Sequence, residues 1–256
     1  VEYILSIDDN NKITKSIYHY FSGTNDLEYI EQRDLTGGQN KLIGLVYYET
    51  YTDNYGRTKS RIDYILSMTL DDDGNEIWTY SEHVYYSGNN TDESDRVDVY
   101  NYNYSQSSRA DDPLRSIYYE SYGDGDKRVD YIETYVYNSQ GGLVDTETTQ
   151  YFYLDDQSGY SGSPTDLIWY LLEDDGTRIY YEVYNSDNDQ RISEVWVKGR
   201  SDQINYYTYE SGTDKLRQVD NYDGSVIYYQ DYTNANNDVK QRVYQVVDED
   251  GTTRTY

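Results

Sequence analysis

The side chains that could do chemistry in this 256-residue chain are two histidines, a large surplus of carboxylates and many aromatic rings. His19 lies in SIYHYF and His83 in YSEHVYY. The neighbours of each alternate as in a β-strand, which favours a histidine on a strand face over a catalytic one. With 48 acidic residues, no pair of carboxylates can be singled out as acid and nucleophile, and no serine lies in a G-x-S-x-G motif. We therefore expect no catalytic residue and no enzyme activity.

The acidic turns are candidate calcium sites, because calcium binds six to eight oxygen ligands. The EF-hand spacing needs acids at loop positions 1, 3 and 5 with glycine at position 6. Counting back from Gly74 puts Thr69 at position 1, and counting back from Gly251 puts Val246 there. Residues 123–126 (GDGD) resemble the glycine–aspartate repeats of calcium-binding β-rolls, but they occur once. We expect no cofactor and no dedicated metal ligand, and at most weak calcium binding at the acidic turns.

The 37 tyrosines and three tryptophans are candidate carbohydrate platforms, because aromatic rings stack on sugar faces. They recur in nearly every segment, and repeated residues in an array usually serve the repeat. We therefore expect most rings to pack the sheet. The candidate platform residues are Tyr118-Tyr119, Tyr206-Tyr207-Thr208-Tyr209, Tyr228-Tyr229, Trp78, Trp169 and Trp196.

The elements that position these rings are predicted to be short β-strands. In residues 128–138 (RVDYIETYVYN) side chains alternate with the period of two of a pleated strand. Clusters of Asp, Asn and Gly between such segments indicate hairpin turns. Segments of this kind begin with a basic and an aliphatic residue at Lys12-Ile13, Lys41-Leu42, Arg61-Ile62, Arg96-Val97, Arg128-Val129, Arg178-Ile179, Arg191-Ile192, Lys215-Leu216 and Arg242-Val243.

The predicted fold is all-β, an antiparallel hairpin or meander array of about sixteen strands by the spacing of the turns. Helix periodicity is absent, and the connections are too short for parallel crossovers. We expect an extended or coiled sheet, with a β-propeller of four blades as the alternative.

Composition explains how such a sheet could hold together. Leu, Ile, Val and Phe make up 19% of the chain and the net charge is −27, a combination typical of disorder. Tyrosine favours strands, and cross-strand tyrosine pairs each contribute roughly 0.2–1 kcal/mol. We expect residues 1–256 to form a single tyrosine-rich array that can be part of a longer chain. Stretches 105–113 and 157–165, which hold both prolines, are candidate hinge loops.

The charge and the absence of cysteine restrict partners and compartment. An acidic chain, with a pI near 4.1, lacks the positive charge that nucleic acids and anionic membranes require. The sequence has no apolar run long enough for a membrane-spanning helix. We expect an extracellular or cell-surface protein of a prokaryote, with no nucleic-acid partner and no membrane insertion.

Three segments show a family resemblance. Residues 135–143 (YVYNSQGGL) resemble the Tyr-x-Tyr-Asp-x-x-Gly-Arg-Leu unit of YD-repeat (RHS-type) proteins. Residues 51–58 (YTDNYGRT) and 184–192 are similar to it more loosely. The resemblance covers three of about sixteen segments. It implies an extracellular array of β-hairpins that coil into a strand-rich shell.

These features together predict a non-enzymatic structural protein, a segment of a fibre, stalk or surface layer. A meander leaves two open edges that can pair with another copy. The predicted contact strands are residues 1–7 (VEYILSI) and 241–247. Because the net charge of −27 keeps copies apart, we expect self-association to depend on salt or divalent cations. The alternative is an adhesin or carbohydrate-binding module that uses exposed Tyr and Trp rings on a polysaccharide.

Overall fold

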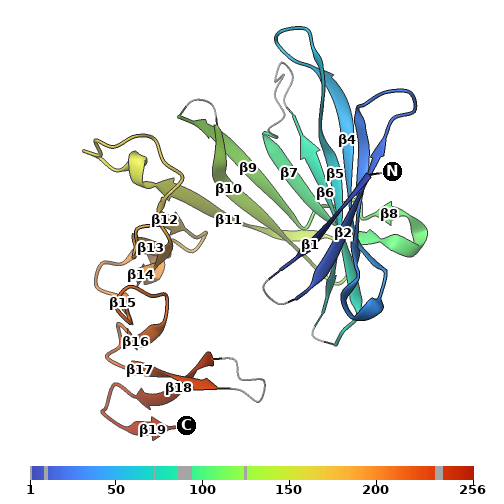
Figure 1. Ribbon diagram of the computed structural model, residues 1–256. Helices are drawn as coiled ribbons and strands as arrows, with labels where there is room; N and C mark the ends of the chain where they lie inside the picture. Colours follow the sequence, from blue (N-terminus) through green and yellow to red (C-terminus); the bar gives the residue numbers. More distant parts are fainter. Residues whose placement is uncertain (1, 9–10, 72, 86–93, 124–125, 234–238) are drawn as a thin grey trace. The chain divides into compact units, whose positions relative to one another are not determined.

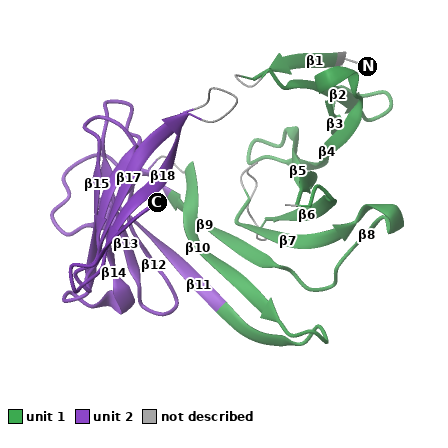
Figure 2. Ribbon diagram, turned by 90° about the horizontal axis from the view of Figure 1, so that it is seen from below, with its two compact units in different colours: residues 1–121, 126–146 green, residues 122–125, 147–256 purple. Residues whose placement is uncertain are grey.

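A computed structural model describes residues 2–8, 11–71, 73–85, 94–123, 126–233 and 239–256 (Figure 1). These residues form nineteen β-strands and four three-residue 3-10 helices. They divide into two compact units, Val1–Ser121 with Asp126–Thr146, and Tyr122–Gly125 with Glu147–Tyr256 (Figure 2). The predicted all-β class is confirmed.

The first unit holds the strands of the N-terminal half of the chain. β11 (Leu143–Tyr153) begins in this unit and ends in the second. The other elements are β1 (Glu2–Ile7), β2 (Ile13–Tyr20), β3 (Leu27–Asp34), η1 (Thr36–Gly38), β4 (Lys41–Thr52), β5 (Thr58–Leu70), β6 (Glu76–Val84), β7 (Arg96–Asn103), η2 (Tyr104–Gln106), β8 (Ser108–Arg109), β9 (Arg115–Tyr122) and β10 (Asp126–Tyr137).

The second unit continues with shorter strands. Its elements after β11 are η3 (Leu154–Asp156), β12 (Ile168–Leu172), β13 (Arg178–Val183), β14 (Gln190–Trp196), η4 (Val197–Gly199), β15 (Ile204–Tyr209), β16 (Leu216–Asp220), β17 (Val226–Thr233), β18 (Val239–Val247) and β19 (Thr253–Thr255).

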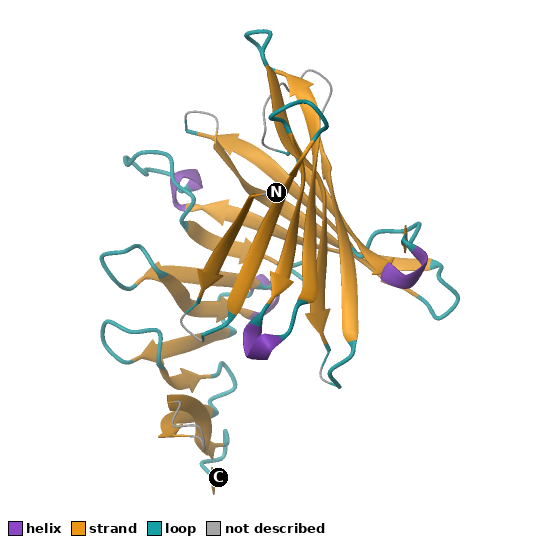
Figure 3. Cartoon of the chain, turned by 45° about the vertical axis from the view of Figure 1, so that its right-hand side comes forward, coloured by secondary structure: helices purple, strands orange, loops and turns teal. Residues whose placement is uncertain are grey.

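Each strand pairs with the next strand along the chain, as the sequence of orange arrows joined by loops shows (Figure 3). The only departure among the described strands is β8, a short strand that pairs with β7 while β7 also pairs with β9. All strands belong to one open antiparallel sheet. The predicted meander is therefore confirmed, and the propeller alternative is wrong, because the consecutive pairing is not divided into separate blades.

One five-residue turn recurs between the strands. In residues 53–57, 71–75, 138–142, 173–177, 221–225 and 248–252 the first N–H donates to the fifth carbonyl and the fourth N–H donates to the first carbonyl. The fourth residue is always glycine with φ between 75° and 87°. Such a left-handed residue is what a type I turn followed by a bulge requires, so glycine sets the turn.

The apolar core is thin. Its buried members include Leu66, Val97 and Val99 in the first unit and Tyr153 and Val219 in the second. None of the large side chains in the described ranges falls below 2% exposure. Stability must therefore come from many half-buried contacts across the strands, as the composition predicts.

The two stretches predicted as hinges differ, because the first contains a short strand and the second lies between strands. Residues 105–113 include most of η2 and all of β8, and residues 157–165 connect η3 to β12. No helix in the described ranges is long and apolar enough to cross a membrane.

Candidate functional site

Four of the predicted strand starts belong to a longer sequence unit, which occurs four times in the chain. It reads Tyr-Tyr-(Glu or Gln)-x-Tyr, followed by a turn and then Arg with Ile or Val. It begins at Tyr47, Tyr118, Tyr180 and Tyr228, and its arginines are Arg61, Arg128, Arg191 and Arg242. The sequence prediction recognised the tyrosine pairs and the basic strand starts separately and missed the unit that joins them.

The arginine of this unit binds the acidic or amide residue of the preceding strand. Arg61 lies opposite Glu49 on the neighbouring strand, with its Nε 2.7 Å from Glu49 Oε1. Its guanidinium also lies 3.6 Å from the ring centre of Tyr85 and 5.0 Å from that of Tyr51. One arginine therefore joins β4, β5 and the residue that follows β6.

The same contacts recur in the second unit. Arg191 lies opposite Glu182, with Nε 2.8 Å from Oε1, and its guanidinium is 4.3 Å from Tyr209 and 5.0 Å from Tyr184. Arg242 lies opposite Gln230 and 5.2 Å from the ring of Tyr232. We call these groups arginine clamps. Their repetition shows that the strand-start arginines hold adjacent hairpins together.

In three of the four units the two tyrosines of the pair separate at a β-bulge. The register shifts between Tyr47 and Tyr48 and between Tyr180 and Tyr181, as it does between Tyr228 and Tyr229. The first tyrosine joins a stack of rings across the strands. For Tyr48 and Tyr181, the second member of the pair, burial raises the pKa of the hydroxyl.

In the first unit the stacked rings form a ladder across β2 to β6. Ring centres are 4.1 Å apart for His19 and Tyr29, 5.4 Å for Tyr29 and Tyr47, 4.4 Å for Tyr47 and Tyr64, and 4.8 Å for Tyr64 and Tyr80. Burial, with the nearby carboxylates of Glu82 and Asp63, raises the pKa of Tyr80 to about 12. These rings are shared between neighbouring strands, which is the arrangement expected if they pack the sheet.

The second unit has a similar group of rings. The ring of Tyr170 stacks on Phe152 at 4.4 Å and lies 5.1 Å from Tyr180. Trp169 and Trp196 both contact Tyr180, at 6.3 and 5.2 Å. These two predicted platform residues therefore pack within one cluster, whereas Trp78 belongs to the first unit.

Trp78 lies in a groove of about 680 Å³ formed by β6, β7, η2 and β8. Its side chain is covered, with 7% of the residue exposed, because the Tyr104 ring stacks on it at 4.4 Å. The residues lining the groove are Glu76, Trp78, Asn101, Tyr102, Asn103, Tyr104, Ser105, Ser108, Arg109 and Ala110. Of the aromatic residues predicted to form a platform, Trp78 is the one that lies in this groove.

A second candidate for function is the open edge of β1. β1 pairs with β2 along all six of its residues, and no strand in the described part of the chain pairs with its other edge. Tyr3, Ile4 and Leu5 are 58%, 58% and 53% exposed, and Ile7 is 68% exposed. An edge strand with this much exposed apolar surface is a typical site of strand addition.

The second predicted edge strand is covered over part of its length. Residues 241–247 belong to β18, which pairs with β17 on one side and with β19 on the other. β19 is only three residues long and covers residues 245–247, so the first half of β18 keeps one open side in the described structure. A short strand after the 248–252 turn was not expected from the sequence, because TRTY gives little strand signal.

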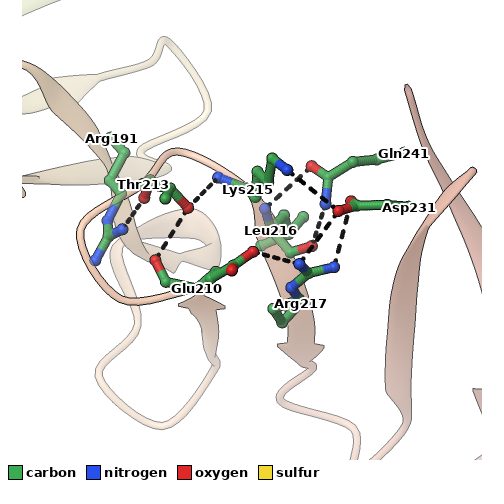
Figure 4. A network of polar contacts seen from close by, with 8 residues as sticks. All are labelled: Arg191, Glu210, Thr213, Lys215, Leu216, Arg217, Asp231 and Gln241. Carbon is green, nitrogen blue, oxygen red and sulfur yellow. Dashed lines mark hydrogen bonds and ion pairs between the residues drawn. The ribbon is translucent and has the colours of Figure 1, made fainter. Parts of the chain in front are cut away.

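A polar network ties the turn before β16 to β14, β17 and β18 (Figure 4). Asp231 accepts from Lys215 Nζ at 3.2 Å and from both terminal nitrogens of Arg217 at 3.3 Å. The amide of Gln241 bonds both the N–H and the carbonyl of Leu216, at 3.1 and 2.7 Å.

The amide of Gln190 makes the same pair of bonds to the backbone of Ile168, at 2.8 and 2.6 Å. In both places a glutamine side chain bonds the first residue of the strand two positions earlier in the sheet. It thereby satisfies backbone groups at the point where the strand begins. We call these two groups glutamine bridges.

The histidines lie on strands, as predicted. His19 stacks on Tyr29 at the start of the ring ladder. His83 lies on β6 with Nδ1 3.3 Å from Ser94 Oγ, and burial lowers the pKa of its imidazole.

The carboxylates of the turns bond their own backbone. Asp53 accepts from the N–H groups of Tyr55 and Arg57 and pairs with the Arg57 guanidinium at 2.7 Å. Burial raises its pKa, but these hydrogen bonds outweigh that effect and bring the pKa to about 2. Asp72 of the 71–74 turn, and Asp124 and Gly125 of the GDGD segment, lie outside the described residues. Elsewhere no group of three acidic or histidine side chains is placed to hold a metal.

Comparison with known proteins gives weak likenesses only. No family model and no curated protein matches the chain. Among solved structures, TcdB2-TccC3 with Cdc42 is 12% identical over 94% of this chain, with a TM-score of 0.28. TcdB2-TccC3 without its hypervariable C-terminal region is 11% identical over 96%, also with a TM-score of 0.28. A porin-like protein from Bacteroides uniformis ATCC 8492 is 7% identical over 94%, again with a TM-score of 0.28.

This chain spans 14% of the length of those TcdB2-TccC3 chains and 91% of the porin-like protein. Likenesses of this size establish neither a family nor a function. The resemblance to YD-repeat proteins therefore remains a hypothesis drawn from the three segments quoted above.

Proposed function

We propose that this chain is a non-enzymatic structural β-repeat protein, a segment of a fibre, stalk or surface layer outside a prokaryotic cell. The recurring contacts support this proposal. Arginine clamps and stacked tyrosines join strand to strand in both units, so the recurring side chains are occupied in holding the sheet together. An array built this way can present a long surface without a large core.

The second part of the proposal is that copies of the chain self-associate. The exposed open edge of β1 is the observation that supports it. Adding a strand to this edge would pair its free backbone groups and cover Ile4 and Leu5. Burying an aliphatic side chain of this size contributes about 1.5–3 kcal/mol when burial is complete. The occupant we propose is β1 of a second copy, because antiparallel pairing of β1 with itself brings apolar side chains together.

The charge of the chain opposes this contact. At −27 the copies repel one another, and salt screens that repulsion over about 10 Å at 0.1 M ionic strength. Association should therefore rise with added salt, while the apolar contact itself should not weaken.

Sedimentation velocity at low and high salt tests the proposal, with negative-stain electron microscopy to show the form of the assembly. We expect the wild type to associate at high salt and Leu5→Lys to remain monomeric. Val239→Lys is the matched control, because Val239 is also an exposed aliphatic residue near an open strand edge, with 61% exposure. A wild type that stays monomeric in high salt, or a Leu5→Lys variant that associates as well as Val239→Lys, would overturn the proposal.

A further inference from the structure

The groove on β6, β7, η2 and β8 contains a tyrosine ring that is held in place and borders open space. Packing of the sheet does not require such a ring. Tyr104 is 44% exposed although one face of its ring stacks on Trp78. Tyr102 lies edge-on to it, with ring centres 6.4 Å apart. Most other tyrosines that stack are shared between strands, whereas the outer side of Tyr104 borders the groove.

The backbone that carries Tyr104 is fixed locally. Asn103 caps the 3-10 helix η2, because its Oδ1 accepts from the N–H of Gln106 at 3.2 Å and from Ser105 Oγ at 2.7 Å. A ring that is oriented before a ligand arrives loses little conformational freedom on binding.

The charged groups of the groove are already neutralised. Glu76 pairs with Lys41 at 3.0 Å, and Arg109 pairs with Glu82 at 3.4 Å. The Arg109 guanidinium also lies 4.1 Å from the ring centre of Tyr100. The groove therefore offers no unpaired charge to an ionic ligand, and the net charge of −27 disfavours an anionic one.

The remaining lining groups are uncharged hydrogen-bonding side chains. Among the described residues, the amide of Asn101 and the hydroxyls of Ser108 and Tyr102 have no hydrogen-bond partner. An amide both donates and accepts, as does a hydroxyl, which matches the hydroxyl groups of a sugar. A groove of about 680 Å³ lies within the range typical of small-ligand sites.

We propose that this groove binds a neutral oligosaccharide, with one sugar ring stacked against Tyr104 and its hydroxyls bonded by Asn101 and Ser108. Aromatic stacking and uncharged hydrogen bonding together match the faces and the hydroxyl groups of a neutral sugar. This binding is an activity separate from the self-association at β1.

Affinity electrophoresis in native gels tests the site, with laminarin, galactomannan and dextran as neutral probes and polygalacturonate as the anionic probe. A gel without polysaccharide provides the reference mobility for each protein. We expect at least one neutral polysaccharide to retard the wild type and polygalacturonate not to do so. Tyr104→Ala should weaken that retardation by roughly ten-fold in apparent dissociation constant, which equals about 1.4 kcal/mol.

Tyr55→Ala is the matched control, because Tyr55 is an exposed tyrosine of the same unit that lies at a turn away from the groove. Asn101→Ala tests the hydrogen-bonding side of the site without touching the ring stack. Failure of all three neutral polysaccharides to retard the wild type overturns the proposal. Equal retardation by polygalacturonate also overturns it. So does an effect of Tyr55→Ala as large as that of Tyr104→Ala, and so does unchanged binding by both Tyr104→Ala and Asn101→Ala.

Discussion

Replacing Arg61 with alanine should destabilise the first unit far more than replacing an ordinary exposed arginine. The Arg61 side chain is 15% exposed and bonds Glu49 at 2.7 Å. Its stacking at 3.6 Å from the Tyr85 ring should contribute about 1–2 kcal/mol, since it is largely desolvated. The partly exposed ion pair with Glu49 adds about 0.5–1 kcal/mol, so Arg61→Ala should lower the free energy of unfolding by about 2–3 kcal/mol.

Two further variants separate the causes. Arg61→Lys keeps the charge but loses the planar group that stacks and bonds at the same time, so we expect it to recover at most half of the loss. Arg115→Ala is the control, because Arg115 is an exposed arginine at the start of β9 and its side chain forms no hydrogen bond or ion pair with the described residues.

Urea unfolding followed by tryptophan fluorescence measures the effect on one unit. Trp78 is the only tryptophan in the first unit, so a Trp169→Phe/Trp196→Phe background makes the signal specific to it. With a denaturant slope of about 1–3 kcal/mol per molar, a loss of this size shifts the midpoint by about 1 M. If the Arg61→Ala midpoint matched that of Arg115→Ala, the clamp would be incidental. If Arg61→Lys restored the midpoint in full, the contribution would come from charge alone.

Two other predictions concern the rings and the glutamine bridges. The pKa of Tyr80 is raised to about 12, so the stability that depends on its neutral hydroxyl is complete below pH 10 and is lost as the pH rises toward 12. Between pH 8 and pH 11 the urea midpoint of the wild type should therefore fall further than that of Tyr80→Phe. An equal fall in the two proteins would count against the raised pKa of Tyr80. Gln190→Ala should cost about 1–3 kcal/mol, because it leaves the N–H and carbonyl of Ile168 without their side-chain partner. Hydrogen exchange at the Ile168 amide should accelerate in this variant and not in the exposed control Gln150→Ala, and equal rates would show that the bridge is dispensable.

The strands could be predicted because turn and strand signals are local. Lys41 and Arg178 are the first residues of β4 and β13, and Arg96 is the first residue of β7. Arg61 and Arg242 lie three residues inside their strands, because the three residues before each of them are also extended. Residues next to a turn are compatible with both a strand and a loop. The first residue of each strand therefore depends on pairing with the partner strand.

The contacts between strands could not be predicted in the same way. Whether Arg61 meets Tyr85 depends on the register of two successive hairpins and on the bulge between Tyr47 and Tyr48. A shift of one residue moves a side chain to the other face of the sheet, and sequence alone does not fix that shift. The groove at Tyr104 was missed for a related reason. Its ring is positioned by a three-residue 3-10 helix, an element too short to leave a periodic pattern.

The order of strand pairing also bears on how the chain could fold. Each strand pairs with the next, so residues that interact lie close together in the sequence. Among the hydrogen bonds and ion pairs given above, the largest separation is 35 positions, for the ion pair of Lys41 with Glu76. Contacts of such short sequence separation carry a small loop-closure cost and favour rapid folding. A hairpin of either unit can therefore form as soon as it and its predecessor have emerged from a ribosome. The chain could be completed strand by strand from its N-terminal side, without waiting for a distant segment.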